Sequence, residues 1–286
     1  MIESDRNSYP EQNNLCGKDE LDLHKCTLED LDELQALSES VNWNQLPADW
    51  RNFIELGGVW CMKNLDRIVG TAAWIPRSSS TVWIGVVITK PEWRGRSIAT
   101  KLMKKIIEES SCYDSRLLDA SAMGEPVYRK LGFKEMYIVS RMGIGGICTP
   151  SRLSWKPVSE DDVKKLFPGD PLPMQLFKNA PELCKIAENN GKILGYFMGR
   201  YGLKSVHFGP LYAENTAIAI DAVNEMRAIA GNAQVTMDIM GYQKDFINLL
   251  LENGADLKRD FTRMYHGKYT CAENPEMFAA AGPEYG

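Results

Sequence analysis

The order of helices and strands predicted for the first half of this 286-residue chain returns in its second half. Hydrophobic patterning predicts helices at 27–37, 51–56, 98–109 and 126–131, and strands at 59–63, 68–76, 81–89, 116–120 and 135–142. Later segments repeat parts of this order at an offset near 120 to 125 residues, namely 158–166, 193–200, 206–211, 235–238, 249–254 and 263–264. A constant offset with an unchanged order indicates a duplicated fold.

The mixture of strand pairs and strand–helix–strand units predicts the α/β fold class with a mixed sheet. We expect two tandem domains, each a central mixed sheet flanked by helices. The polar stretch 1–20 is expected to be a flexible leader, followed by a catalytic domain at 21–145 and a divergent domain at 146–286. A segment rich in Gly and Pro, 143–150, is expected to link the two.

Composition excludes several classes of protein. Hydrophobic residues make up 44% of the chain and charged residues 25%, as in a globular protein with a core. The net charge of −5 argues against a nucleic-acid partner, and no apolar run reaches the roughly 20 residues of a membrane helix. The seven Cys are far apart, without a CxxC pair, and there are three His, so we expect neither a disulfide framework nor a metal site. These features, with no signal peptide, predict a cytoplasmic protein with reduced cysteines.

The strand at 81–89 leads through a tight turn into the helix that starts near residue 98. This turn carries Arg94, Gly95, Arg96, Ser97 and Ala99. Backbone N–H groups at a helix start point toward one spot, which the helix dipole makes attractive to anions. Small residues let a phosphate approach the backbone, and the arginines add positive charge. The segment therefore predicts a phosphate or pyrophosphate cradle, the alternative being an ordinary turn with solvated arginines.

Residues 91–99, Pro-Glu-Trp-Arg-Gly-Arg-Ser-Ile-Ala, resemble the acetyl-CoA signature of the GNAT acetyltransferase superfamily. That signature reads Gln or Arg, two residues, Gly, one residue, then Gly or Ala, and Arg94, Ser97 and Ala99 fall on its defined positions. Residues 125–133, Glu-Pro-Val-Tyr-Arg-Lys-Leu-Gly-Phe, resemble a second family motif. The resemblance covers about 21–145. The whole chain is similar to tandem GNAT proteins with a divergent second copy, including its ending at 282–286.

Two positions depart from the family pattern. Ser97 stands where Gly is usual, so that its side chain either crowds the pyrophosphate or donates its hydroxyl to it. Ser121 stands seven residues before Tyr128, where many members carry Asn. The residues that the resemblance places against acetyl-CoA are Val86, Val87, Ile88, Arg94, Gly95, Arg96, Ser97, Ile98, Ala99, Ser121 and Tyr128.

The resemblance implies direct transfer, in which an amine attacks the thioester and the CoA thiolate leaves. Backbone N–H groups of the strand at 86–88 would stabilise the carbonyl oxygen, and Tyr128 would protonate the thiolate. The sequence offers no decisive base. Asp49 and Glu55 lie in the region that covers acceptors in this family, but we expect both to be solvated surface carboxylates. Asp119 is a candidate to cap the turn after its strand rather than to take part in chemistry.

The loop before the sheet predicts part of an acceptor pocket, because the family uses this region to hold the amine. Trp43, Asn44 and Asp49 are its candidate residues, with a hydrophobic lid over the core as the alternative. The expected partner is a small amine or a peptide amine. The sequence favours a small cationic amine and leaves the oligomeric state open.

The second half lacks the site. Opposite the cradle it has 214–219, Glu-Asn-Thr-Ala-Ile-Ala, and opposite Tyr128 it has Leu250. We expect this half to keep its fold and to shape the acceptor pocket or pack against the first half. Its candidate acceptor contacts, Tyr201, Asp238, Tyr242 and Arg263, are expected to be mainly structural.

Three functions agree with this sequence. The first is an acetyltransferase with one active half, the second a non-catalytic acyl-CoA sensor or scaffold, and the third a partner-binding module without a CoA site. Ser97 and the lack of an obvious base keep the second alternative open.

Overall fold

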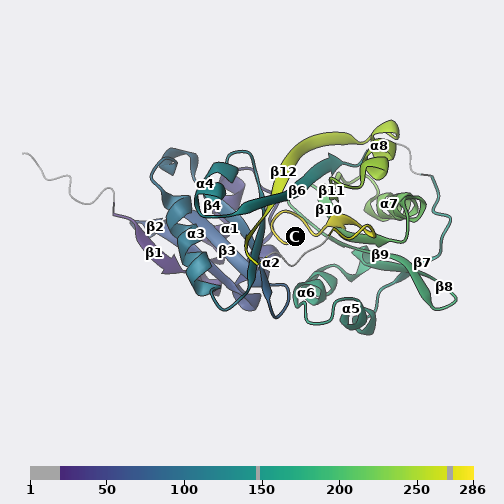
Figure 1. Cartoon of the computed structure of the whole chain (residues 1–286), viewed down its shortest axis with the longest axis horizontal. Helices are drawn as coiled ribbons and strands as arrows, with labels where there is room; N and C mark the ends of the chain where they lie inside the picture. Colours follow the sequence, from purple (N-terminus) through teal and green to yellow (C-terminus); the bar gives the residue numbers. More distant parts are fainter. Residues whose placement is uncertain (1–19, 146–148, 269–272) are drawn as a thin grey trace, which may run out of the picture.

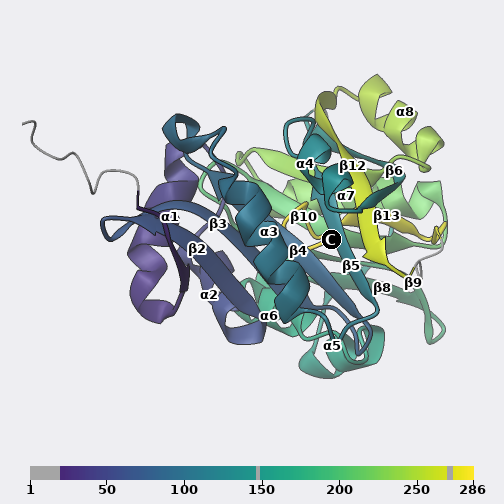
Figure 2. The same cartoon turned by 60° about the vertical axis from the view of Figure 1, so that its left-hand side comes forward.

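The computed structural model describes residues 20–145, 149–268 and 273–286, so the predicted leader lies almost wholly outside the described residues. Figure 1 shows the first half at one end of the molecule and the second half at the other, joined by long strands between them. The turned view in Figure 2 shows that the chain ends between the two halves.

The first half contains the predicted elements in the predicted order, together with one strand before them, at residues 22–25, that was not predicted. They are β1 (Asp22–Lys25), α1 (Leu31–Ser40), α2 (Pro47–Leu56), β2 (Gly58–Asn64), β3 (Arg67–Pro76), β4 (Thr81–Thr89), α3 (Ile98–Glu109), β5 (Ser115–Ala120), α4 (Glu125–Lys130) and β6 (Lys134–Gly143). Helix α2 begins earlier than predicted, because Pro47 fits the first turn and the Asp49 carboxylate accepts the Leu46 N–H at 2.8 Å. A single 3-10 turn precedes α1, where Thr27 and Asp30 form a capping box.

The second half repeats this order and adds a strand at its end. Its elements are β7 (Trp155–Pro157), α5 (Glu160–Leu166), α6 (Leu172–Asn179), β8 (Lys185–Asn189), β9 (Lys192–Arg200), β10 (Val206–Ala213), α7 (Thr216–Ala230), β11 (Val235–Met240), α8 (Lys244–Glu252), β12 (Asp256–Gly267) and β13 (Met277–Ala280). The mixed α/β fold and the duplication predicted from the sequence are confirmed.

The two halves exchange their long final strands. The sheet order is β1-β2-β3-β4-β5-β12-β6-β11-β13-β10-β9-β8-β7. Strand β12 of the second half therefore pairs with β5 of the first, and β6 of the first half pairs with β11 of the second. Figure 1 shows β6 and β12 running side by side between the halves. The exchange makes one continuous sheet out of two copies of the fold.

Two equivalent ion pairs cross this exchange. Arg263 on β12 donates to Asp119 on β5, from Nε at 2.8 Å and from an NH2 nitrogen at 2.9 Å. Arg141 on β6 donates in the same way to Asp238 on β11, at 2.8 and 2.7 Å. Both carboxylates are completely buried. Burial opposes the ionisation of Asp238, but the Arg141 charge outweighs it and holds the pKa of Asp238 below its usual range.

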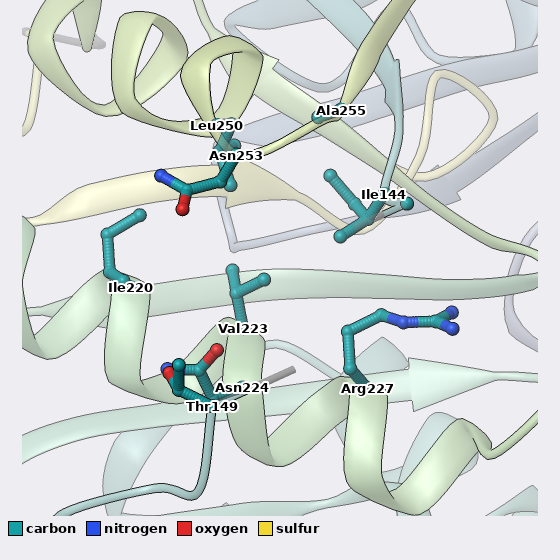
Figure 3. Close-up of a pocket in the computed structure, with 10 residues that line it drawn as sticks. Ile144, Thr149, Ile220, Val223, Asn224, Arg227, Leu250, Asn253 and Ala255 are labelled. Atoms are coloured by element: carbon teal, nitrogen blue, oxygen red, sulfur yellow. The ribbon is translucent and has the colours of Figure 1, made fainter. Parts of the chain in front are cut away.

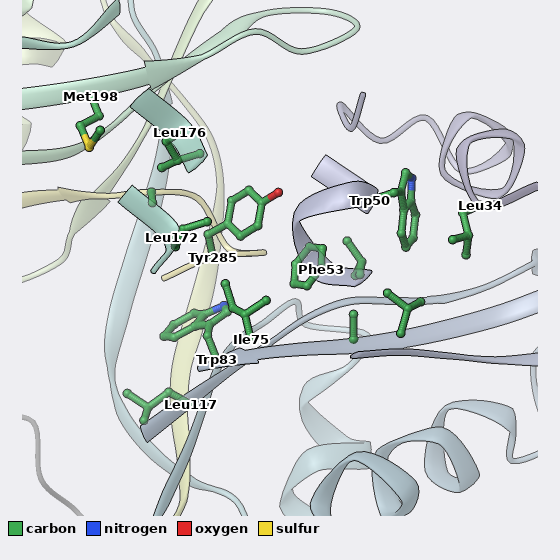
Figure 4. Close-up of a cluster of buried hydrophobic side chains, with 14 of the residues drawn as sticks. Leu34, Trp50, Phe53, Ile75, Trp83, Leu117, Leu172, Leu176, Met198 and Tyr285 are labelled. Atoms are coloured by element: carbon green, nitrogen blue, oxygen red, sulfur yellow. The ribbon is translucent and has the colours of Figure 1, made fainter. Parts of the chain in front are cut away.

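A shared hydrophobic core joins the halves on one face of the sheet. Leu34 and Phe53 from the first half belong to the same buried cluster as Leu172 and Leu176 from α6. Figure 4 shows Tyr285 between Phe53 and the α6 leucines, and its ring stacks on Phe53 with a centroid distance of 5.0 Å. Helices α3 and α4 cover the opposite face of the first half, over a separate cluster. The face of the sheet that α1 and α2 cover therefore packs against the second half.

Candidate functional site

Strands β4 and β5 separate soon after they meet. They are paired in parallel only through Thr81–Trp83 and Ser115–Leu117, although β4 continues to Thr89 and β5 to Ala120. Beyond these pairs the backbone edge of β4 that faces β5 has no ladder partner among the described strands. The hydrogen-bonded ladder of the sheet therefore has a gap between β4 and β5 in the centre of the first half.

A strained bulge lies in β4 at this gap. The β3–β4 register shifts between Thr71 and Ala73, so that β4 holds one extra residue before Ile88. Val86 has a φ of 44°, which a β-branched residue rarely adopts, and its carbonyl accepts the Thr71 hydroxyl at 2.8 Å. Strain of this kind persists only where surrounding contacts enforce it, and it is frequent at functional sites. Val86, Val87 and Ile88 thus line the gap, where the sequence predicts the oxyanion donors.

The predicted cradle forms the start of α3. Ser97 is the N-cap residue, with a φ of 60°, and its side chain makes no capping bond. The Lys101 N–H donates to Ser97 O, so the N–H groups of Ile98, Ala99 and Thr100 come before the first helical bond. These donors therefore face outward at the positive end of a 12-residue helix.

The turn before α3 leaves room for a ligand. Gly95 has a φ of 79°, and a Cβ added there would meet nothing within 4 Å. Gly95, Arg94, Arg96 and Ser97 are all exposed, and the Arg96 guanidinium lies over the Trp93 ring, 4.6 Å from its centroid. An open helix start, two exposed arginines and a left-handed turn fit a diphosphate. The left-handed φ of Ser97 also gives a backbone reason for Gly at this place in the family pattern.

Tyr128 lies on the α3–α4 face beside the gap. It belongs to the same buried cluster as Ile84 on β4 and Ala120 on β5, with Val87 packed against that cluster. Burial alone raises its pKa well above the usual value of a phenol, so the hydroxyl keeps its proton at neutral pH. The structure thus places the predicted proton donor in the same buried cluster as side chains of the two strands that border the gap.

Ser121 follows β5 at the edge of this gap. Its Oγ accepts the Gly124 N–H at 3.3 Å, and its carbonyl accepts the N–H groups of Gly124 and Glu125 at 2.9 Å. Ser121 therefore stabilises the turn into α4. Its predicted contact with acetyl-CoA stays a prediction.

In the second half, the places equivalent to the strand gap and to the open helix start are both occupied. Strand β13 enters the space between β10 and β11 and pairs with both, through Leu211–Ala279 and Ile239–Ala279 among other pairs. At the start of α7, the Asn215 side chain accepts the Ile218 N–H at 3.1 Å and occupies the helix end that α3 leaves open. The gap and the anion cradle are thus both filled by the chain itself.

A pocket between α7 and α8 does not replace the site that the second half has closed. Figure 3 shows aliphatic side chains of Ile220, Val223 and Leu250 on its walls, and Leu250 stands opposite Tyr128 in the repeat. Arg227 also lines the pocket, but it donates to the carbonyls of Gly231 and Ala233 at the end of α7. No carboxyl, thiol, imidazole or phenol lines this pocket among the described residues.

The predicted acceptor residues have different surroundings. Trp43 packs at the edge of the shared core. The Asn44 amide is bound to the second half, since its oxygen accepts the Lys204 N–H at 2.6 Å and its nitrogen donates to Ser205 O at 3.0 Å. Asn44 therefore fixes the halves to each other, and a contact with the amine stays a prediction.

Asp49 is not the solvated surface carboxylate that the sequence suggested. Only 4% of the residue is exposed, because Tyr285 and Arg200 of the second half cover it. The Tyr285 hydroxyl donates to Asp49 Oδ1 at 2.9 Å, and Arg200 NH1 lies 3.5 Å from both carboxylate oxygens. Glu55, in contrast, is exposed and pairs with Arg51 on its own helix at 3.4 Å. The missing information was the position of the second half over α2.

The other polar candidates have structural partners. Asp119 binds Arg263 and caps no turn, and Asp238 binds Arg141. The Tyr201 hydroxyl donates to Glu182 at 2.7 Å, and that of Tyr242 donates to Asn274 O at 3.1 Å.

Sequence reasoning missed the residues that complete the surroundings of Asp49. These are Arg200, Glu284 and Tyr285, all buried. The resemblance included the ending 282–286, but nothing local showed that it lies against β4. The Glu284 backbone occupies the space where a Cβ of Gly85 would lie, one residue before the bulge. To predict that Glu284 lies against Gly85, one would have to know that the two halves exchange their final strands.

Over the described ranges, no helix combines the length and apolarity needed to cross a bilayer. In the same part of the chain, no group of three or more His, Cys, Asp or Glu side chains is placed to hold a metal ion.

Two family models match the chain, one in each half. Both are described as acetyltransferase (GNAT) domains, and they match residues 55–135 and 174–279. No curated protein matches the sequence. The first match contains the gap, the cradle and Tyr128, and the second contains β10, β11 and most of β13, which fills the equivalent gap.

Solved structures share the tandem fold at low sequence identity. A Pyrococcus horikoshii protein provisionally assigned as an acetyltransferase is 17% identical, covers 98% of this chain and 100% of its own, and has a TM-score of 0.78. A GCN5-related N-acetyltransferase of Sphaerobacter thermophilus is 14% identical, with coverages of 88% and 96% and a TM-score of 0.61. A tandem GNAT protein of the clavulanic acid pathway is 11% identical, with coverages of 88% and 100% and a TM-score of 0.61. The two domain matches and this shared fold show that the chain belongs to the GNAT acetyltransferase family, as a tandem of two GNAT domains.

Proposed function

We propose that the first half binds acetyl-CoA and transfers its acetyl group to a primary amine of a small molecule, and that the second half does not turn over acetyl-CoA. The observation that carries this proposal is the combination of the gap at the Val86 bulge with the open start of α3. An acetyl-CoA molecule held by its diphosphate at residues 95–100 would lie beside the unpaired edge of β4, and this edge leads to the bulge at Val86. In the second half, β13 and Asn215 fill both places.

For the steps of this acetyl transfer, the chain itself supplies the hydrogen-bond donors and the acid. The amine nitrogen forms a bond to the acetyl carbon while the bond from that carbon to sulfur breaks. Backbone N–H groups at 86–88 supply hydrogen bonds as charge develops on the carbonyl oxygen. The Tyr128 hydroxyl supplies a proton to the leaving sulfur, the proton lost by the amine passes to solvent, and Tyr128 regains a proton from solvent before the next turnover.

Release of free thiol from acetyl-CoA distinguishes this function from the two alternatives. Calorimetry with acetyl-CoA comes first, because a partner-binding module without the site takes up no acetyl-CoA. Thiol release is then followed with a panel of primary amines. We expect binding and amine-dependent release, whereas a sensor would bind acetyl-CoA and release no thiol with any amine.

Replacing Tyr128 by Phe is expected to lower kcat about 100-fold, the size of effect found for a positioned general acid. The affinity for acetyl-CoA should stay within about twofold, because the ring that packs against Phe133 is kept. Stopped-flow thiol release measures kcat, and calorimetry measures affinity. Tyr113→Phe is the control, since Tyr113 packs against Trp74 away from the gap. An unchanged kcat in Tyr128→Phe would exclude the proposed acid.

A further inference from the structure

One side chain of the neighbouring strand holds the bulge in β4. Thr71 on β3 is completely buried, and its hydroxyl donates to the Val86 carbonyl at 2.8 Å, a normal length for such a bond. The register shift between Thr71 and Ala73 leaves Ala72 opposite two residues of β4, Val86 and Val87. Because a bulge interrupts the regular backbone ladder, a side-chain donor stabilises the Val86 carbonyl at the point of interruption.

The same hydrogen bond sets the direction of the next N–H group. The peptide bond between Val86 and Val87 is trans and close to planar, so its C=O and its N–H point in opposite directions. The carbonyl points toward β3, where it meets the Thr71 hydroxyl, and the Val87 N–H therefore points away from β3. The edge of β4 on that side is the one that faces the gap.

This peptide orientation needs support, because the backbone at Val86 is strained. Its φ of 44° is one that a β-branched residue rarely adopts, and such conformations cost free energy. A buried carbonyl that loses its donor is also destabilised, so without the Thr71 hydroxyl both effects favour a rotated peptide group. Rotation would turn the Val87 N–H out of the gap.

The second half has different residues at the equivalent places. In the repeat, Tyr196 stands opposite Thr71, and Pro210 stands opposite Val86. The Tyr196 ring stacks on Tyr212, with a centroid distance of 5.1 Å. Within the described part of the chain, a threonine hydroxyl that holds the bulge therefore occurs in the half whose gap is open.

We propose that Thr71 is a positioning residue for acetyl transfer, whose hydroxyl holds the Val86 peptide group so that the Val87 N–H points at the carbonyl oxygen of the thioester. This inference rests on the proposed function of the first half. Thr71 exchanges no proton and touches no reacting atom. Its contribution is that the hydrogen-bond donor is already oriented when charge develops on the oxygen.

Three substitutions of Thr71 test the inference. Thr71→Val and Thr71→Ala remove the hydroxyl, whereas Thr71→Ser keeps it. Because loss of an oxyanion donor costs about 100- to 1,000-fold in rate, a misdirected donor should slow single-turnover thiol release at least about tenfold in the Val and Ala variants. Thr71→Ser should stay within about twofold of the unchanged protein, since the bond to the carbonyl is kept. Calorimetry should show acetyl-CoA affinity within about twofold in all three, because the cradle lies on α3.

Thr89→Val is the matched control on the same strand as the bulge. The Thr89 hydroxyl is buried and makes no hydrogen bond to any described residue, so its removal takes away no contact that holds β4. Thiol release should stay within about twofold, and thermal unfolding confirms that each variant is folded. An unchanged rate in Thr71→Val and Thr71→Ala would overturn the inference, as would a Thr71→Ser variant as slow as Thr71→Val.

A binding measurement separates this inference from the proposed function. Infrared difference spectroscopy of acetyl-CoA, isotope-labelled at its carbonyl carbon, reports hydrogen bonds to the carbonyl oxygen without any transfer. The carbonyl band of bound acetyl-CoA should lie below that of free acetyl-CoA in the unchanged protein and in Thr71→Ser. In Thr71→Val it should return toward the free value.

Failure of either proposal has its own signature. If no amine releases thiol but the band depends on the Thr71 hydroxyl, the transfer proposal fails and the aimed donor remains. If thiol is released at a rate that is insensitive to Thr71, the inference fails and the enzyme proposal remains. If no amine releases thiol and the band is the same in all variants, or if acetyl-CoA is not bound, both fail.

Discussion

Arg263→Met should lower the free energy of unfolding by about 3 to 5 kcal/mol, because it leaves the Asp119 carboxylate buried without its partner. The Arg263 side chain is 7% exposed and Asp119 is not exposed at all, so water does not replace the lost guanidinium. Arg263 also lies over the Trp83 ring, 4.6 Å from its centroid, and Met keeps much of that packing. Urea unfolding followed by circular dichroism measures the change.

Two further variants show that the unpaired charge causes the loss. Asp119→Leu combined with Arg263→Met should recover most of the stability, since apolar replacement of a whole buried pair is often neutral. Arg129→Met removes an exposed guanidinium that pairs with Glu125 and Glu135, and it should cost less than about 1 kcal/mol. If the double variant is as unstable as the single one, loss of packing rather than an unpaired charge is the cause.

The loss in Arg263→Met should depend on pH. Burial raises the pKa of Asp119 even with Arg263 in place, and without the guanidinium the folded-state pKa rises further. A carboxyl with a raised folded-state pKa carries no penalty below its unfolded pKa of about 3.9, and the penalty grows as pH rises above that value. The variant should therefore lose less stability, relative to the unchanged protein, at pH 4.5 than at pH 7.5.

These ion pairs also show what the sequence could predict. Asp119 and Asp238 occupy equivalent places in the repeat, as do Arg141 and Arg263, and their recurrence is visible without a structure. The sequence does not show which of these arginines pairs with which aspartate. The final strands of the two halves have equivalent patterns, so β6 and β12 satisfy either sheet, and an exchange of equivalent strands conserves the local contacts.

For the candidate site, too, the sequence predicts some parts and not others. The cradle at 94–99 and the Tyr128 motif are each contiguous, so helix-start signals pointed to the first and the resemblance to the GNAT family pointed to the second, while their contacts with acetyl-CoA stay predictions. The surroundings of Asp49 depend on Arg200, 151 positions away in the chain, and on Tyr285, 236 positions away. No local pattern encodes contacts of that separation, and a carboxylate near a helix start is usually solvated. Asp49 was therefore identified as a candidate and assigned the wrong surroundings.

Ala99→Glu should weaken acetyl-CoA binding about 100-fold or more, with little effect on folding. A carboxylate in the first turn of a helix interacts favourably with the helix dipole, so the variant should be at least as stable as the unchanged protein. The same carboxylate competes for the open N–H groups of α3 and repels a diphosphate there. Losing charge-assisted hydrogen bonds worth about 1.5 to 3 kcal/mol each accounts for a change of this size.

The duplicated fold supplies the control for this variant. Ala217 holds the same second helical position in α7 that Ala99 holds in α3, and it is exposed. Because Asn215 caps α7 and β13 fills the neighbouring gap, Ala217→Glu should leave the affinity for acetyl-CoA unchanged. Calorimetry on both variants, with thermal unfolding to confirm that each is folded, compares the same change in the two halves. Weaker binding in Ala217→Glu alone would place the carrier in the second half, and unchanged binding in both would remove the helix starts from the site. A loss confined to Ala99→Glu would show that one copy of the fold kept its anion cradle while the other closed it with its own chain.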